Sequence, residues 1–175
     1  MKVQTEIDRI YLDAKAIISV LERGNEVSLA NSAADHFRKS LLLACASYFE
    51  RVFCDLLVEF TTKKSGGDEK LTSIVRTRVV SRSYHQWFVW DAKNANSFYS
   101  MFGPDFKQVL EYRHLTDDVF KKSVRAFLEI GNERNKLVHQ NYATFQMNKT
   151  IDEIYSLYTV AHLFEVTIRD ELFAA

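Results

Sequence analysis

The sequence contains only one proline and five glycines in 175 residues. These two residues mark turns and chain breaks, so their scarcity excludes a loop-rich or all-β protein and predicts a mostly helical one. Cysteine is also rare: Cys45 and Cys54 stand nine positions apart in one predicted helix. At about 100° per residue they point to opposite sides and cannot bridge each other. We therefore expect free thiols in a reducing compartment.

No stretch approaches the roughly 20 apolar residues that span a membrane, and the opening "MKVQTEIDRIYLD" lacks the pattern of a signal segment. We therefore predict a cytoplasmic protein without a membrane partner. The chain has no Cys/His spacing typical of zinc and no His-Glu-x-x-His, and its other histidines lie far apart. We expect neither a metal site nor another cofactor.

Charge of one sign is not in excess, because 23 basic residues balance 23 acidic ones. This balance excludes a protein that coats nucleic acid through its bulk charge, so any contact with nucleic acid must be local. The apolar content of 47% is enough for a core without disulfides or metals. We expect one helical domain over residues 1–175.

Apolar residues at three and four spacing predict two long helices in the first third of the chain. The first covers about residues 3–22, with Gly24 as its C-terminal stop. The second covers about residues 32–62 and has apolar residues on more than half of its circumference. We expect it to be the central and most buried helix.

Two further long helices are predicted in the last third. Thr116 is a suitable N-cap for one, and the capping box "TIDE", residues 150–153, begins the other. Between them and the second helix lies an insert of about residues 63–102. After it, the turn "FGPD" places Pro104 at the first position of a shorter helix that extends to about Tyr112.

The insert combines positive charge with aromatic side chains. Seven cations and three acids between residues 63 and 93 leave an excess of four positive charges. Cations interleaved with Tyr84, His85, Trp87 and Trp90 could hold single-stranded RNA by phosphate pairing and base stacking. Aromatic residues at this density are more often part of a core or a partner interface. We leave both interpretations open.

The stretch "GNERNKLVHQNY", residues 131–142, breaks the pattern of the third long helix. The expected apolar face of that helix contains Phe120, Val124, Phe127, Gly131, Arg134 and Val138. Arg134 thus takes a position where an apolar residue is expected. His139 lies about 140° further round, and the helical period is lost directly after it. We predict that the helix ends at His139 and leaves Arg134, Asn135 and His139 at one exposed tip.

These three side chains suit the cleavage of RNA. Histidine ordinarily titrates near pH ~6.5, so it can take the proton of a ribose 2′-hydroxyl at physiological pH. An arginine can hold the phosphate and stabilise its developing charge. Asn135 can orient either group. The alternative is structural, because an arginine and a histidine near a helix C-terminus also cap free carbonyls and complement the helix dipole.

The stretch "RNKLVH", Arg134 to His139, resembles the arginine, polar residue, spacer, histidine signature of the HEPN superfamily. Two further features resemble its stand-alone members: the segment "LLLACASYFERVFCDLL" with its acid, and the order of elements before the last capped helix. The resemblance covers about residues 30–170. HEPN domains are small all-α domains found in ribonuclease toxins and phage-defence effectors.

The resemblance implies an all-α, four- to five-helix HEPN-like bundle that forms a homodimer with two Arg-His pairs in one cleft. It also implies metal-independent RNA cleavage that leaves a 2′,3′-cyclic phosphate, in a toxin or abortive-infection effector with a possible antitoxin or defence partner. The alternative is a non-catalytic HEPN module that binds a partner protein or a nucleotide.

By position, the resemblance makes Arg134 and His139 the catalytic pair and Asn135 the polar second residue. The supporting acid is Glu50 or Glu133, and a plain salt bridge is the alternative for Glu50. Tyr142 is a candidate for regulatory modification. The RNA-binding residues that we expect are Arg76, Arg78, Arg82 and Lys136.

Overall fold

The computed structural model describes residues 5–81 and 83–174, and within them it contains helices and connecting turns only. The fold is all-α and consistent with a HEPN-like bundle, as the sequence predicts. The elements are α1 (Glu6–Arg23), α2 (Val27–Lys64), α3 (Glu69–Ile74), the π-helix η1 (Val75–Val80), α4 (Tyr84–Trp87), α5 (Asn96–Tyr99), the 3-10 helix η2 (Ser100–Phe102), α6 (Pro104–Thr116), α7 (Asp118–His139) and α8 (Ile151–Phe173).

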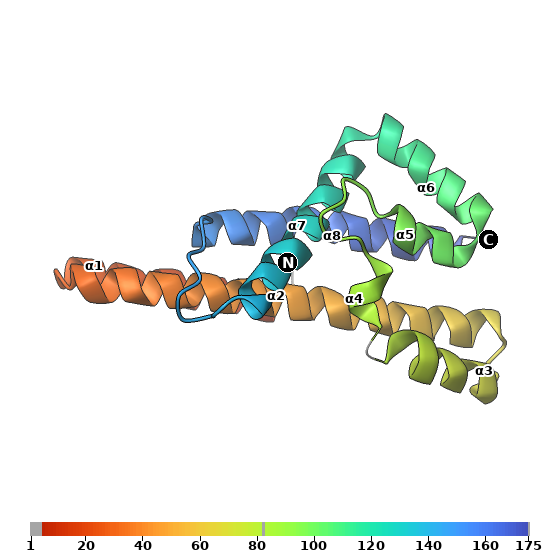
Figure 1. Ribbon diagram of the computed structural model, residues 1–175, viewed down its shortest axis with the longest axis horizontal. Helices are drawn as coiled ribbons and strands as arrows, with labels where there is room; N and C mark the ends of the chain where they lie inside the picture. The colour runs from red at the N-terminus through yellow and green to blue at the C-terminus, as the bar shows by residue number, and fades with distance from the viewer. Residues whose placement is uncertain (1–4, 82, 175) are drawn as a thin grey trace.

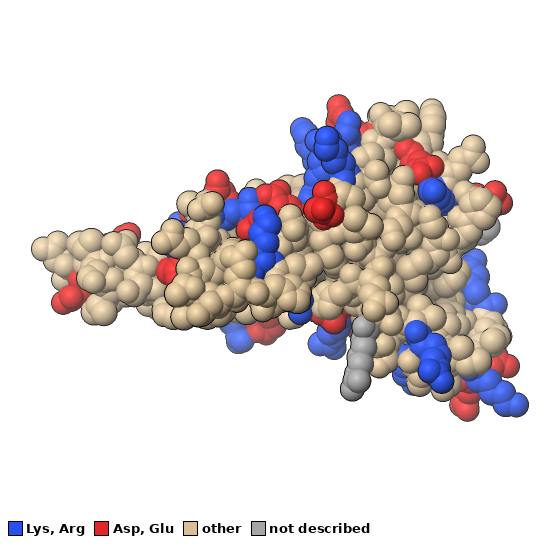
Figure 2. Space-filling model, in the orientation of Figure 1, with Lys and Arg blue, Asp and Glu red and all other residues tan. Residues whose placement is uncertain are grey.

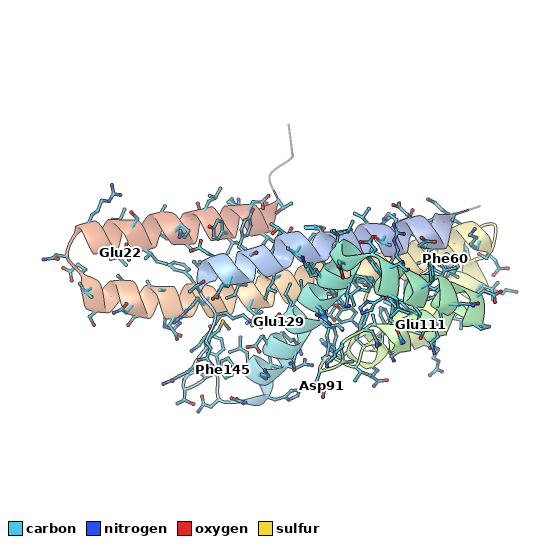
Figure 3. The ribbon with its side chains drawn as sticks, turned by 90° about the horizontal axis from the view of Figure 1, so that it is seen from above. Glu22, Phe60, Asp91, Glu111, Glu129 and Phe145 are labelled. Atoms are coloured by element: carbon cyan, nitrogen blue, oxygen red, sulfur yellow. The ribbon has the colours of Figure 1, made fainter. Side chains whose placement is uncertain are left out.

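Helices α1 and α2 form an antiparallel hairpin, and α8 lies along the hairpin and packs against α7 (Figure 1). Helix α7 runs obliquely across α2 and α8, and the far end of the hairpin projects beyond the start of α8 (Figures 1 and 3). Figure 2 shows few charged side chains on this projecting end. The bundle therefore has its core where α2, α7 and α8 meet.

The first helix begins and ends as its sequence indicates. Thr5 and Asp8 form a capping box, and the N–H of the predicted stop, Gly24, donates to the carbonyl of Val20 over 3.0 Å. The next residue, Asn25, has a φ of 63°. Asparagine tolerates this left-handed conformation, so it completes the turn into α2.

Helix α2 is longer than predicted, because it begins at Val27 instead of residue 32. Its middle, between Leu41 and Leu57, supplies most of its buried side chains, and the rings of Phe49 and Phe53 contact Phe127 there. The turns before residue 37 belong to the projecting hairpin and are mostly exposed. The prediction of a central, buried helix is therefore confirmed for its middle alone.

The predicted N-cap of α7 was wrong by one residue. Thr116 is the last residue of α6, and its hydroxyl donates to the carbonyl of Tyr112 over 2.9 Å. Asp117 caps α7 instead, since its Oδ1 accepts the N–H groups of Val119 and Phe120 over 2.9 Å each. A carboxylate also complements the positive end of the helix dipole, which favours it at this position.

The insert is irregular, as predicted, although residues 63 and 64 belong to α2. Helix α3 continues into the π-helix η1, and the short helices α4, α5 and η2 follow. The side chains of Tyr84, Trp87 and Phe88 are buried in the core. The interpretation of these aromatics as a base-stacking surface is therefore wrong for Tyr84 and Trp87, because their rings pack inside the protein.

Both cysteines are free, as predicted. Burial raises the pKa of the Cys45 thiol to about 12 and that of Cys54 to about 11. Both thiols are therefore un-ionised near neutral pH, which makes them poor nucleophiles. None of the described helices is long and apolar enough to cross a membrane.

Candidate active site

The last turns of α7 contain Arg134, Asn135 and His139, and the helix ends at His139, as predicted. Gln140 has an extended backbone, and its N–H closes the helix on the carbonyl of Lys136 over 3.0 Å. The side chain of Asn141 then accepts the N–H of Ala143 over 3.0 Å and starts a turn. This local hydrogen bond competes with helix continuation, which explains why the helix stops there.

Arg134 and His139 differ in exposure. Arg134 is half-buried, and its Nη1 donates to Oδ1 of Asn135 over 3.2 Å, whereas His139 is exposed. The prediction of one exposed tip is therefore correct for His139 and wrong for Arg134 and Asn135, which are both half-buried. The buried face of α7 also differs from the expected one at its last position. Leu137 is fully buried there, whereas the expected Val138 is 44% exposed.

The side chain of Arg134 lines a small, mostly apolar hollow. Its own helix contributes Phe127, Ile130 and Gly131 to the lining, as the shared face predicts. The rest of the lining comes from α2 and from the insert: Ala46, Phe49, Tyr84, His85 and Trp90. The guanidinium therefore sits where three segments of the chain meet.

The helix-capping alternative receives no support from the hydrogen bonds. Among the described residues, neither the Arg134 nor the His139 side chain donates to a backbone carbonyl. The last turn is closed by the N–H of Gln140 instead. Both side chains are thus available for another role.

Gly131 allows the insert to approach α7. A Cβ atom at this position would lie 1.9 Å from Cε3 of Trp90, far inside contact distance. The indole N–H of Trp90 donates to the carbonyl of His85 over 3.0 Å. The side chain of Trp90 therefore holds the α4 segment, residues 84–90, against α7, the helix that contains Arg134.

His85 is the site residue that sequence reasoning missed. Its Nε2 lies 3.8 Å from Oε2 of Glu50. Burial and the charge of Arg134 lower its pKa, Glu50 raises it, and the charge of His139 lowers it again. The structure thus brings His85, Glu50, Arg134 and His139 into one electrostatic neighbourhood. The only sequence signal was the position of His85 inside the aromatic run.

The two candidate acids differ in their surroundings. Glu133 forms an ion pair with Lys136 at 2.7 Å, and both side chains line a groove with Phe145 of the loop after α7. Glu50 faces His85, and its charge together with that of Arg134 acts on the buried hydroxyl of Tyr84. Glu50 is therefore the acid that lies with the arginine.

The predicted RNA-binding residues lie on separate elements. Arg76 and Arg78 are exposed on η1, and no described acid forms an ion pair with either. Arg82 lies outside the described residues. Lys136 is exposed but paired with Glu133, which neutralises part of its charge.

Tyr142 lies in the loop after α7 and is 41% exposed. Its carbonyl accepts a hydrogen bond from Nζ of Lys39 over 3.1 Å, and the same ammonium lies 5.2 Å from the centre of the tyrosine ring. Lys39 is 2% exposed and also pairs with Asp35 at 2.7 Å. One buried lysine of α2 thus ties down the loop that follows His139.

The fold and the site together indicate the class of protein to which the chain belongs. An all-helical bundle in which a long helix ends on an Arg-x4-His sequence, before a capped last helix, is a HEPN domain. The chain belongs to the RiboL-PSP-HEPN family, whose model matches residues 8–171. Comparison with curated proteins and with solved structures gave no match. In the described part of the chain, no group of three or more His, Cys, Asp or Glu residues could hold a metal ion.

Proposed function

We propose that this protein is a metal-independent endoribonuclease that acts in the cytoplasm as a toxin or an anti-phage abortive-infection effector. HEPN domains are often ribonucleases, which gives the proposal its chemical class. The observation that supports it most is that a half-buried Arg134 and an exposed His139 lie together in the last turns of one helix. Neither side chain is used to cap the helix.

In this mechanism the ribose 2′-oxygen loses its proton and attacks the adjacent phosphorus. The 5′-oxygen leaves and takes up a proton, so the products are a 2′,3′-cyclic phosphate and a 5′-hydroxyl. His139 moves protons in this reaction, and Arg134 stabilises the charge that develops on the phosphoryl oxygens. Asn135, held by Arg134 over 3.2 Å, keeps the guanidinium in position. Glu50 acts as the supporting acid.

A homodimer with its two-fold axis close to His139 is part of the proposal. The chain has no net charge, and one copy offers few unpaired cations at this end of α7. A second copy doubles the arginines and histidines that face one phosphodiester. Small-angle scattering tests the shape of the assembly. A symmetric assembly with the two His139 residues on opposite outer surfaces would contradict this arrangement.

Regulation by an antitoxin or defence partner fits the position of Tyr142. Its ring is exposed in the loop that directly follows His139, so a group added to its hydroxyl would lie beside the site. Co-expression with the product of a neighbouring gene, followed by intact-mass analysis of wild type and Tyr142→Phe, tests this point. A mass increase that persists in Tyr142→Phe would place the modification elsewhere.

The main test is cleavage of an RNA panel that includes tRNA, with purified protein in excess EDTA. We expect cuts that leave 2′,3′-cyclic ends, and no cuts with His139→Ala or Arg134→Ala. The matched controls are His36→Ala and Arg51→Ala, which remove an exposed histidine and an exposed arginine of α2. If the wild type cuts no RNA, with or without its partner, a non-catalytic module that binds a protein or a nucleotide replaces this proposal.

A further inference from the structure

We propose that His85, supplied by the insert, is a second catalytic imidazole: it takes the 2′-hydroxyl proton, while His139 returns a proton to the leaving 5′-oxygen. This inference rests on the proposed ribonuclease function. It changes the part assigned to His139, and it gives the insert a chemical role. Each protomer would then contain a complete acid and base pair.

The geometry places His85 beside Arg134 and Glu50. Its side chain lines the same hollow as Arg134, although the two residues come from different segments of the chain. Its imidazole is 39% exposed, so it is open to a substrate. Figure 3 shows the insert near Asp91 and the loop near Phe145 on either side of the C-terminal part of α7, where the substrate would lie.

The position of His85 is fixed before a substrate arrives. Trp90 holds its backbone carbonyl, and the ring of Tyr84 packs edge-on against the imidazole at 5.3 Å between centroids. Gly131 in turn leaves the space that Trp90 fills. Pre-organised groups of this kind are typical of active sites, because they avoid the cost of ordering the catalyst in each turnover.

The charges around His85 favour its neutral form. Burial and the positive charge of Arg134 lower its pKa, which favours the unprotonated form that can act as a base. Glu50 on α2 opposes these effects and stabilises the imidazolium that forms when the base takes a proton. The neighbouring Tyr84 stays neutral, because burial raises its pKa well above the usual value.

The charge of Glu50 also biases the tautomer. Its Oε2 lies 3.8 Å from Nε2 of His85, beyond hydrogen-bond distance, so its negative charge alone favours the neutral form with the proton on Nε2 and leaves the lone pair on Nδ1. In the reaction Nδ1 takes the proton of the 2′-hydroxyl, and the 2′-oxygen bonds to phosphorus. The bond from phosphorus to the 5′-oxygen breaks, and that oxygen takes a proton from the His139 imidazolium. Proton exchange with water then resets both histidines.

The first experiment compares the pH profiles of kcat/KM for wild type and His85→Gln. We expect a bell-shaped profile for the wild type, with an acid limb from a group that must be deprotonated. His85→Gln should lose about 10²- to 10⁴-fold in rate and lose that limb. A variant with unchanged rate and the same acid limb would overturn the proposal.

Glu50→Gln keeps the inference testable even if His85→Gln fails to fold. Removal of the negative charge lowers the pKa of His85 further, so the acid limb should move to lower pH. A purely structural role for Glu50 would lower the rate without moving the limb, and that result would contradict the proposal.

The roles of the two histidines are separated by an RNA with a sulfur in place of the leaving 5′-oxygen. Sulfur leaves without a proton, so cleavage of this RNA should be restored in His139→Ala but not in His85→Gln. Restoration in His85→Gln instead would overturn the assignment. If the wild type cuts neither RNA, the proposed function fails; if it cuts both and His85→Gln matches it, only this inference fails.

Discussion

Two segments flank the end of α7, and they are held in different ways (Figure 3). The α4 segment, residues 84–90, is packed by its aromatic rings: Tyr84, Trp87 and Phe88 are buried. The loop of residues 140–149 is largely exposed, and Met147 is its one buried residue. Its polar anchors include a hydrogen bond from Lys39 to the carbonyl of Tyr142 and the ion pair between Lys149 and Glu129 of α7.

This difference indicates a site with two unlike sides. We call residues 84–90 the rigid wall and residues 140–149 the adjustable wall. Arg134 and His85 stand on the rigid side, where a change of one methyl group meets an aromatic ring. His139 stands at the helix end next to the weakly packed loop. An RNA or a second copy could adjust the position of His139, whereas the position of Arg134 is set by folding.

The largest expected effect is the loss of activity in Arg134→Ala and His139→Ala, each by about 10²- to 10⁴-fold in kcat/KM. Melting temperature should stay nearly unchanged in His139→Ala, because exposed positions alter the free energy of unfolding by within about 0.5 kcal/mol, and it should fall more in Arg134→Ala, because Arg134 is half-buried. Kinetics and thermal melts on the same samples check this. Unfolding of the His139→Ala variant would revive the capping role of this histidine.

The rigid wall is tested by Gly131→Ala. The added Cβ meets the indole of Trp90 at 1.9 Å, so overpacking should lower the free energy of unfolding by about 1–3 kcal/mol. Urea titrations measure this change. In a Trp90→Ala background the same substitution should cost little, since the clashing ring is gone. An equal cost in both backgrounds would show that Trp90 is not the cause.

The adjustable wall is tested by Lys39→Met. Loss of the charged donor to Tyr142 should destabilise the protein by about 1–2 kcal/mol and loosen the loop after His139. Hydrogen exchange should rise in residues 140–149 and stay unchanged in residues 84–90. Faster exchange in both segments would mean that the two walls are one cooperative unit.

The contact between Lys39 and Asp35 predicts that the free energy of unfolding depends on pH. The hydrogen bond from Lys39 lowers the pKa of Asp35, so its stabilising effect is fully present above the unfolded pKa of about 3.9. It should be lost as the pH falls through the lower folded pKa. Unfolding curves between about pH 5 and pH 2 should therefore differ between wild type and Lys39→Met. Parallel curves would contradict the contribution of this pair.

The smallest expected effect concerns the exposed arginines of η1. Replacing Arg76 and Arg78 by Gln should weaken RNA binding a few-fold and reduce the salt dependence of log K by about 0.7 for each lost phosphate contact. Cleavage within the bound complex should not change. Unaltered affinity and salt slope would make the insert cations simple solvated groups and leave the insert with its packing role alone.

The sequence was informative where the cause is local. The spacing of apolar residues predicted the long helices, and the loss of period after His139 predicted the end of α7. It failed where the cause is distant or depends on one residue. Asp117 replaced Thr116 as the cap because its carboxylate accepts two N–H groups. Nothing in the spacing of His85 showed that Trp90 and Gly131 would bring it to α7.

The most direct test of the central claim uses an RNA with a single 2′-deoxy nucleotide on the 5′ side of a mapped cut. In-line attack by the 2′-oxygen requires that hydroxyl, so cleavage at this bond should disappear while cuts elsewhere in the same RNA continue in excess EDTA. The unmodified RNA should give a 2′,3′-cyclic phosphate at that bond by mass spectrometry. Cleavage of the 2′-deoxy RNA at the same bond would contradict the account.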